Sequence, residues 1–564
     1  MKKALWKANN SRLAFGLLVA GLVLFRLLLS HALLVCFSSG SYYDDLMQIN
    51  KAMSVANGGW LGGYGSLTLV KGVGFPLLTA VFHWLHLPYI WAYQLLYILA
   101  ASFFMWAVAP VVKNKWAGLL AYAFVLYNPI AFSAQITRLY RDIGYYSLAF
   151  LCISFALGLL LRYKREKQNL FFVFGTGFFL VFCATFREDS QWLFVYVGCV
   201  FALYAFLRFF VRKGFSFKKL ASFLLVFALG WALYAAPISL TNYLYYGTFA
   251  LDEYNSGAFA RAYGALTRID NGTQDSRLAL PEAQRMQLYA LSPAFAELKE
   301  VLDGPNSPYA EWKAVQGEYL TGYFSFVLRD AAASIGKYES AQTANEYFTR
   351  LANEVNEVCD AGLIAAGPRR SGITARYYPW MNGPIVTATR ECMVSTLRCG
   401  NISPIPLPAN EDDALFAHYE NFTYSTIAGN RYMPSGEIVD NYHFSGWQLF
   451  LQRAARAIVF AYSLVLPLLF AAACLAFFAS FIFRLVKKTL KKDFVVPWLA
   501  AGSLLAAFVL RCFMIAFVQV SSFSVIGVPS YEAAGYPVLL AFIALTALLT
   551  LQPLLAKKPP APEV

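Results

Sequence analysis

The sequence predicts an all-α polytopic membrane protein with about ten transmembrane helices and a mainly helical extracytoplasmic domain. The first observation is composition: of 564 residues, 59% are hydrophobic and only 14% are charged, unlike an ordinary soluble protein. The second is a series of apolar runs of about 20 residues, the length that crosses a bilayer core of about 30 Å. The third is the distribution of lysine and arginine, which alternates from one loop to the next.

The apolar runs justify the individual spans. The first run follows a basic start and is long enough to cross a membrane by itself, so we expect no cleavable signal peptide. An aromatic content of 17% fits lipid-facing packing and interfacial belts. The expected spans are 14–36, 89–112, 116–134, 144–161, 170–186, 190–207, 220–240, 454–483, 494–520 and 534–553.

Basic residues cluster at the N-terminus, in every second loop and at the C-terminus. By the positive-inside rule, this pattern places both termini in the cytoplasm. The net charge of +14 therefore reflects topology, and we expect no nucleic-acid partner. The clusters are Lys2/Lys3/Lys7/Arg12, Lys113/Lys115, Arg162/Lys164/Arg165/Lys167, Arg208/Arg212/Lys213/Lys218/Lys219, Arg484/Lys487/Lys488/Lys491/Lys492 and Lys557/Lys558.

The same topology places a long polar segment, 241–452, outside the membrane. It holds most of the Asp and Asn residues, and the stretches 309–336 and 340–362 alternate polar and apolar residues with helical period. We therefore expect a folded aqueous domain, which we assign to no family. The expected domains are a transmembrane core at 1–240 with its first outer loop at 37–88, the outer domain at 241–452, and the last transmembrane helices with a short cytoplasmic tail at 453–564.

Cysteine and histidine carry few signals. Cys359, Cys392 and Cys399 fall in the outer domain, so at most one pair forms among them. Cys392 and Cys399 are closest in sequence, and an extracytoplasmic setting permits a disulfide. With five histidines and no Cys/His spacing of the zinc type, we assign no metal ligands.

Charged residues gather in the outer loops, at the membrane rim. The stretch YYDDLMQINKAMSVANGGW sets Asp44 and Asp45 just beyond the first span, where carboxylates near hydrocarbon are costly. Arginines on this side also run against the positive-inside bias and need an explanation. The other rim residues are Arg138, Arg141 and Asp142 in the second loop, Arg187, Glu188 and Asp189 in the third, Arg511 in the outer half of the ninth span, and Tyr531 and Glu532 in the last loop.

These charges either pair between helices or form a functional site. For any single residue, structural pairing is as good an explanation as function. For the set, function is favoured, because guanidinium groups bind phosphate in bidentate fashion and a carboxylate accepts a proton from an attacking hydroxyl or amine. Both properties suit a reaction on an anionic, lipid-linked substrate.

The first outer loop resembles that of the GT-C glycosyltransferases. These multispanning enzymes use polyprenyl-phosphate sugars; protein O-mannosyltransferases and the lipid A aminoarabinose transferase are examples. In that family an Asp-Asp or Asp-Glu pair follows the first span, then a Gly-x-Trp-like element and a Pro-containing entry into a short helix. Here these are Asp44-Asp45, Gly58-Gly59-Trp60 and KGVGFP at 71–76. The resemblance covers roughly residues 10–240 and, more loosely, the last spans, where SYEAAGYPVLLAF is similar to the closing element; the FREDSQW turn is not a general family motif.

The resemblance implies a glycosyltransferase of the plasma membrane that moves a sugar from a polyprenyl-phosphate donor to an extracytoplasmic glycan, lipid or protein by inverting attack. Asp44 would be the catalytic base, and Asp45 would orient the acceptor or help to bind a cation. No cofactor is required, although a divalent cation at the acidic residues is compatible with the pattern. By their position at the rim, the candidates for binding the donor phosphate are Arg138, Arg141, Arg187 and Arg511, with Lys71 a weaker one. The acceptor side of the rim would be formed by Asp142, Glu188, Asp189, Tyr531 and Glu532.

Two other classes fit part of the pattern. A transporter or flippase of an anionic lipid-linked sugar would use the same arginines to move its substrate. Transporters often show two similar halves and helices broken at mid-membrane, and the sequence shows no such repeat. A receptor or assembly factor would leave the rim charges as structural pairs, and loss of sugar transfer in a folded Asp44→Asn variant would distinguish the enzyme from it.

Overall fold

The regular structure of the protein is helical. The computed structural model describes residues 2–35, 42–211, 216–270, 272, 275–313, 317–403, 413–425 and 445–552. Within these residues the structure contains no β-strand, only isolated bridges such as those of Ile269 with Ala366 and Leu278 with Leu320. The expected all-α class is therefore confirmed.

Eight helices in the described part of the chain are long and apolar enough to cross a membrane. Each of them overlaps one of the expected spans. They are α1 (Lys2–Leu28), α4 (Tyr89–Val108), α6 (Asp142–Leu161), α7 (Glu166–Phe186), α8 (Gln191–Phe206), α9 (Phe217–Tyr246), α18 (Gly446–Val486) and α19 (Lys492–Ser521).

The two remaining expected spans, 116–134 and 534–553, contain shorter apolar helices, α5 (Lys115–Leu126) and α21 (Gly535–Thr550). In α5 the helix stops early because Asn128 and Pro129 begin a 3-10 turn, in which the Asn128 side chain accepts a hydrogen bond from the backbone of Ile130. Proline has no backbone N–H and fits the first turn of a helix better than its interior. A continuous apolar sequence therefore overestimates the length of this helix.

The centre of the bundle is α6, whose apolar window is wholly buried by protein, compared with 17% of the corresponding window in α1. It packs against α4, α7, α8 and α19. Because α6 begins at Asp142, its amino-terminal end carries one of the rim acids into the middle of the bundle. The rim therefore lies against the most deeply buried of the apolar helices that the structure describes.

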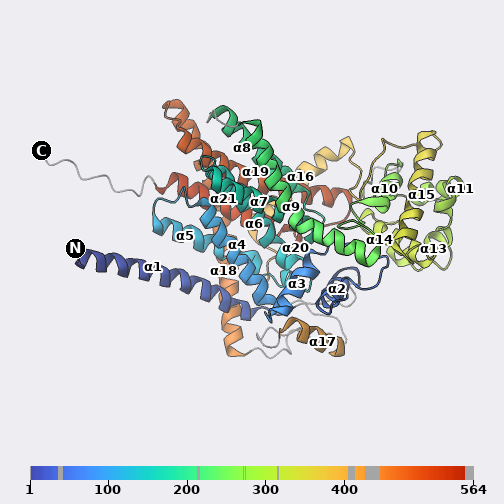
Figure 1. Ribbon diagram of the computed structural model, residues 1–564, viewed down its shortest axis with the longest axis horizontal. Helices are drawn as coiled ribbons and strands as arrows, with labels where there is room; N and C mark the ends of the chain where they lie inside the picture. The colour runs from blue at the N-terminus through green and yellow to red at the C-terminus, as the bar shows by residue number, and fades with distance from the viewer. Residues whose placement is uncertain are drawn as a thin grey trace.

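The polar segment 241–452 begins with a compact helical body. Its helices α10, α11, α13 and α15 gather at the right of Figure 1, at the end of the molecule opposite the start of α1. In α15, Phe348, Leu351, Val355 and Val358 are buried at a spacing of three or four residues, which forms one apolar face. The body contains α10 (Gly257–Thr267), α11 (Glu282–Leu291), α12 (Pro293–Ala296), α13 (Lys299–Asp303), α14 (Thr321–Ser334) and α15 (Ala341–Asp360).

The rest of this segment returns to the transmembrane core. Helix α16 (Asn382–Arg398) packs along α19 and α18. Helix α17 (Asp413–Thr423) reaches α3 (Gly74–Trp84), where the Phe422 ring stacks on His83 with centroids 4.5 Å apart. The outer segment therefore contacts the core at more than one place.

Cys392 and Cys399 are both free, buried thiols. Seven residues along a helix separate two side chains by about 10 Å, which is beyond the reach of a disulfide. The Cys399 thiol instead donates to the carbonyl of Thr396 at 3.7 Å. The disulfide that the sequence permitted between them is therefore absent.

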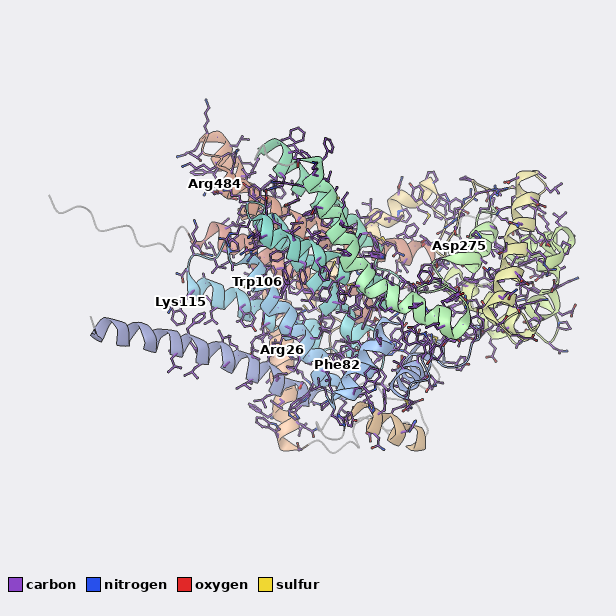
Figure 2. The ribbon with its side chains drawn as sticks, viewed as in Figure 1. Arg26, Phe82, Trp106, Lys115, Asp275 and Arg484 are labelled. Atoms are coloured by element: carbon purple, nitrogen blue, oxygen red, sulfur yellow. The ribbon has the colours of Figure 1, made fainter. Side chains whose placement is uncertain are left out.

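Two labelled members of the basic clusters lie away from the outer domain, as the expected topology requires. Lys115 and Arg484, from two of the basic clusters, lie toward one end of the molecule, and Asp275, from the polar segment, lies at the other (Figure 2). Which end faces the cytoplasm stays a prediction.

Cysteine labelling tests this prediction. Lys164, before α7, and Glu300, in α13, are both exposed, so a cysteine at either position should react wherever the reagent reaches it. We expect a membrane-impermeant maleimide to label Glu300→Cys in intact cells. It should label Lys164→Cys only after the cells are permeabilised. The exposed native Cys199, which lies in a span, gives the background in the unsubstituted protein. Labelling of Lys164→Cys in intact cells would contradict the predicted topology.

Candidate active site

Asp44 lies in a π-helical turn, Tyr42–Leu46, that leads into α2 (Met47–Ala56). Its carboxylate accepts a hydrogen bond from the ammonium of Lys71 and another from the hydroxyl of Tyr140 at 2.9 Å. The Lys71 side chain is buried, whereas 41% of the Asp44 side chain is exposed. Asp44 is therefore held in a fixed position and remains accessible to a substrate.

The adjacent carboxylate has a different environment. Asp45 is fully buried, and Arg138 binds both of its oxygens, with Nε–Oδ2 and Nη2–Oδ1 distances of 3.2 and 2.5 Å. Such a bidentate pair fixes the turn that carries Asp44. Of the two acids predicted as catalytic, Asp44 is the one that a substrate can reach.

Three cations act on Asp44. Burial opposes its ionisation, but the charge and hydrogen bond of Lys71, followed by the charges of Arg141 and Arg138, hold the pKa of the carboxyl well below its usual range. Lys71 also donates to the Tyr43 carbonyl at 2.7 Å and to the Tyr140 hydroxyl at 3.0 Å. Asp44 is therefore ionised at neutral pH.

A second group of charges centres on Arg187, which follows α7. Its guanidinium pairs with Asp142 at the start of α6 and with Asp189 at 2.8 Å. It also donates to the Ser530 carbonyl at 2.9 Å and lies over the Tyr531 ring, 4.6 Å from its centroid. Arg187 is 4% exposed, so this residue joins three loops inside the protein.

Arg511 of α19 completes this second group. It donates to Asp189 Oδ2 at 2.8 Å and to the Tyr531 carbonyl at 2.6 Å. Burial opposes the ionisation of Asp189, but the positive charges of Arg187 and Arg511 lower its pKa to about 2. The guanidinium groups of Arg187 and Arg511 are thus both neutralised by acids of the rim.

Arg141 connects the two groups. It pairs with Glu188, and its guanidinium lies 4.9 Å from the centroid of the Tyr140 ring. Neither Arg141 Nε nor Glu188 Oε1 has a hydrogen-bond partner among the residues that the structure describes, although both atoms are buried. One donor and one acceptor therefore remain available to a ligand.

The structure brings nearly all the predicted rim residues into one continuous cluster. Glu532 is the exception: it accepts hydrogen bonds from the Gly527 amide at 2.8 Å and from the Ser395 hydroxyl at 3.1 Å, so its partners are not rim arginines. Burial raises the pKa of Glu532 to about 7. The members of the cluster are Asp44, Asp45, Lys71, Arg138, Arg141, Asp142, Arg187, Glu188, Asp189, Arg511 and Tyr531.

Sequence reasoning missed Tyr140. Its ring lies beside three cations, with centroid distances of 5.1 Å to Lys71, 5.4 Å to Arg138 and 4.9 Å to Arg141. The motif RLYRD, in which one aromatic residue separates two rim arginines, was the signal available. Cation–π contacts of this kind stabilise desolvated positive charge.

The outer domain contacts the turn that carries Asp44. The Tyr43 hydroxyl donates to one carboxylate oxygen of Asp330 in α14, and the Ser66 hydroxyl donates to the other at 2.6 Å. Next to it, Arg329 donates to the Ser66 carbonyl at 2.7 Å. These contacts join segments that are 263 to 287 residues apart, and no local sequence pattern predicted them.

A divalent cation at Asp44 and Asp45 stays a prediction. In the described ranges no group of three His, Cys, Asp or Glu side chains converges in the way that a metal site requires. Both carboxylates instead face cationic side chains, Lys71 and Arg138.

Comparison with known proteins yields a similar solved structure. No protein-family description matches the chain, and no curated protein matches it. Among solved structures the chain is similar to ArnT from Cupriavidus metallidurans, whose crystal structure was determined in the apo state. The match has 11% sequence identity and a TM-score of 0.29, and it covers 97% of this chain and 78% of that one. These values establish neither activity nor substrate, so the function proposed below rests on the residues of this chain.

Proposed function

We propose that this protein is an integral-membrane glycosyltransferase that moves a sugar from a polyprenyl-phosphate donor to an extracytoplasmic acceptor with inversion. The observation that carries the proposal is the contact between Asp44, which is ionised and accessible, and the buried ammonium of Lys71. A proton acceptor beside an anion-binding group suits a displacement in which a hydroxyl loses its proton while a phosphate departs. The lipid-phosphate donor is the class that the resemblance of the first outer loop implies.

The reaction assigns one role to each group. An acceptor hydroxyl or amine attacks the anomeric carbon from the face opposite the phosphate. The new bond to that carbon forms as the bond to the phosphate oxygen breaks, and the electron pair leaves with the phosphate. The proton of the acceptor passes to Asp44. Lys71 and Arg141 offset the negative charge that grows on the leaving phosphate.

Lys71 also links donor binding to activation of the base. In the structure its ammonium holds the pKa of Asp44 low, and a carboxylate of low pKa is a weak general base. A donor phosphate that attracts Lys71 would remove part of this stabilisation of the charged form. The pKa of Asp44 would then rise, and the base would become stronger when the donor is bound.

A transfer assay tests the proposed function. The full-length protein, purified in lipid nanodiscs, is given polyprenyl-phosphate sugars and envelope extracts, and labelled sugar is followed into the acceptor fraction. Mass spectrometry of envelope glycans with and without the gene identifies the product. Transfer of no sugar by a folded protein that binds these donors would contradict the proposal.

A variant of the outer domain tests its contact with Asp44. Asp330→Ala removes the acceptor for Tyr43 and Ser66, so we expect kcat of transfer to fall by about 10- to 100-fold. This range corresponds to the loss of charge-assisted hydrogen bonds of about 1.5–3 kcal/mol. Because Asp330 acts through Tyr43, the affinity for the donor lipid should not change.

The matched control is Asp360→Asn in the same domain, whose carboxylate is 38% exposed and pairs with Arg268 and Arg369. We expect wild-type kcat from this variant. Equal kcat in Asp330→Ala and wild type would show that the outer domain does not position the turn.

A further inference from the structure

The face of α2 next to Asp44 carries two buried polar side chains that the proposed chemistry does not use. Gln48 and Lys51 lie three residues apart in α2, a spacing that places them on one side of this helix, and Asp44 lies in the π-helical turn just before it. Gln48 is 1% exposed and Lys51 is 5% exposed. Within the part of the chain that the structure describes, neither Gln48 Oε1 nor Lys51 Nζ has a hydrogen-bond partner.

The acids around Lys51 are already paired. The charges that act on its ammonium are those of Lys71 and Arg329, which repel it, and that of Glu188, which attracts it. Glu188 accepts from Arg141, and Arg329 donates to Glu253 at 3.1 Å. Lys51 therefore adds a positive charge to a region whose carboxylates already have cationic partners, and its own Nζ makes no hydrogen bond to Glu188 within the described residues.

Packing of the fold does not require a lysine at position 51. Its neighbours Ile49, Ala52 and Val55 in α2 are buried apolar residues, so an apolar side chain would pack at this position without desolvating a charge. A buried charge that lacks a partner is costly. Burial, assisted by the positive charges of Lys71 and Arg329, lowers the pKa of Lys51 to about 7. Residues that cost stability are concentrated at functional sites.

We propose that Lys51 and Gln48 form an oxyanion subsite beside Asp44, which binds a second phosphate or carboxylate group of the substrate. The subsite deepens the proposed function and rests on it. The Lys51 ammonium supplies the positive charge that attracts the anion. The Gln48 side-chain carbonyl accepts a hydrogen bond from a hydroxyl group of the substrate next to that anion. The leaving phosphate lies on Lys71 and Arg141, and the second anion lies on Lys51, where the charges of Lys71 and Arg329 also act.

This anion has two chemical sources. It is either the second phosphate of a diphosphate-linked donor or an acidic group of the acceptor. Three probes distinguish the sources: polyprenyl monophosphate, polyprenyl diphosphate and inorganic phosphate, each titrated against the full-length protein in nanodiscs. The variants are Lys51→Met, which keeps most of the length of the side chain, and the control Lys337→Met. In the wild type the Lys337 ammonium pairs with Glu297 in the outer domain at 2.6 Å.

If the donor supplies the anion, the wild type should bind the diphosphate at least tenfold more tightly than the monophosphate. Lys51→Met should then remove that difference without changing the affinity for the monophosphate. If the acceptor supplies it, both lipids should bind equally well to both proteins. Inorganic phosphate should then bind to the wild type loaded with monophosphate and not to Lys51→Met. Identical binding of all three probes by wild type and Lys51→Met would overturn the subsite. Failure of the wild type to bind the monophosphate would count against the proposed function instead.

Thermal unfolding provides a second measurement. Without a probe, Lys51→Met should unfold at the same temperature as the wild type or higher, because it removes a buried charge that has no partner. A variant that unfolds several degrees lower, or fails to fold, would show that Lys51 is structural and would also overturn the subsite.

The pH dependence of binding provides a third measurement. Wild-type binding of the probe that Lys51 recognises should weaken as the pH rises above about 7, since the ammonium that attracts it loses its proton there. Lys51→Met should lack this dependence. The other charges that face Lys51 are those of Lys71, Arg329 and Glu188, and all three remain in the variant, so an equal pH dependence in both proteins would exclude Lys51 as its origin.

Discussion

Asp44→Asn should lower the rate of sugar transfer by about 10²–10⁴-fold, the usual contribution of a positioned general base. Asparagine keeps the size of the side chain and can still accept hydrogen bonds from Lys71 and Tyr140, but it cannot take the proton of the acceptor. Donor binding should change much less than kcat. The measurement is single-turnover transfer with a polyprenyl-phosphate sugar that the wild type uses.

The accessibility of Asp44 makes this result specific. Because 41% of its side chain is exposed, the substitution should leave the fold intact, as thermal unfolding will show. Asp45→Asn is a contrasting variant: it weakens a fully buried pair with Arg138, so we expect it to reduce stability. Transfer by Asp44→Asn at the wild-type rate would end the assignment of this carboxylate as the base.

Arg187→Met should destabilise the protein by about 3–5 kcal/mol, the cost of removing one partner of a buried ion pair. Its partner Asp142 is 3% exposed and would be left without its guanidinium inside the bundle, while Asp189 would keep Arg511. Chemical unfolding in detergent measures this change. Combining Arg187→Met with Asp142→Asn should recover part of the loss, since the second substitution removes the orphaned charge.

The control for Arg187 is Arg350→Met, which breaks a pair between Glu297 and a half-exposed arginine. Exposed pairs contribute about 0–1 kcal/mol, so this variant should unfold close to the wild type. If Arg187→Met kept wild-type stability and lost donor affinity, its guanidinium would act on the substrate rather than on the fold.

The sequence by itself determined the helical class, the long spans and the position of most rim charges in the short loops between them. These properties are local: each window of about 20 apolar residues must satisfy its own backbone hydrogen bonds in lipid, and it does so as a helix. The spacing of Asp44 and Asp45 after the first span was equally visible in the chain. The end of α5 was not, because an apolar run continued past Asn128 and Pro129.

Only the tertiary structure decided what each charge does. It separated the accessible Asp44 from the buried Asp45, turned Glu532 away from the rim arginines and left Lys51 without a partner. These outcomes depend on contacts between distant segments, such as Asp189 with Arg511, which are 322 residues apart. A charge in a sequence has no fixed partner; its role is set by the groups that packing brings within a few ångströms, where burial makes the presence or absence of a counter-charge decisive.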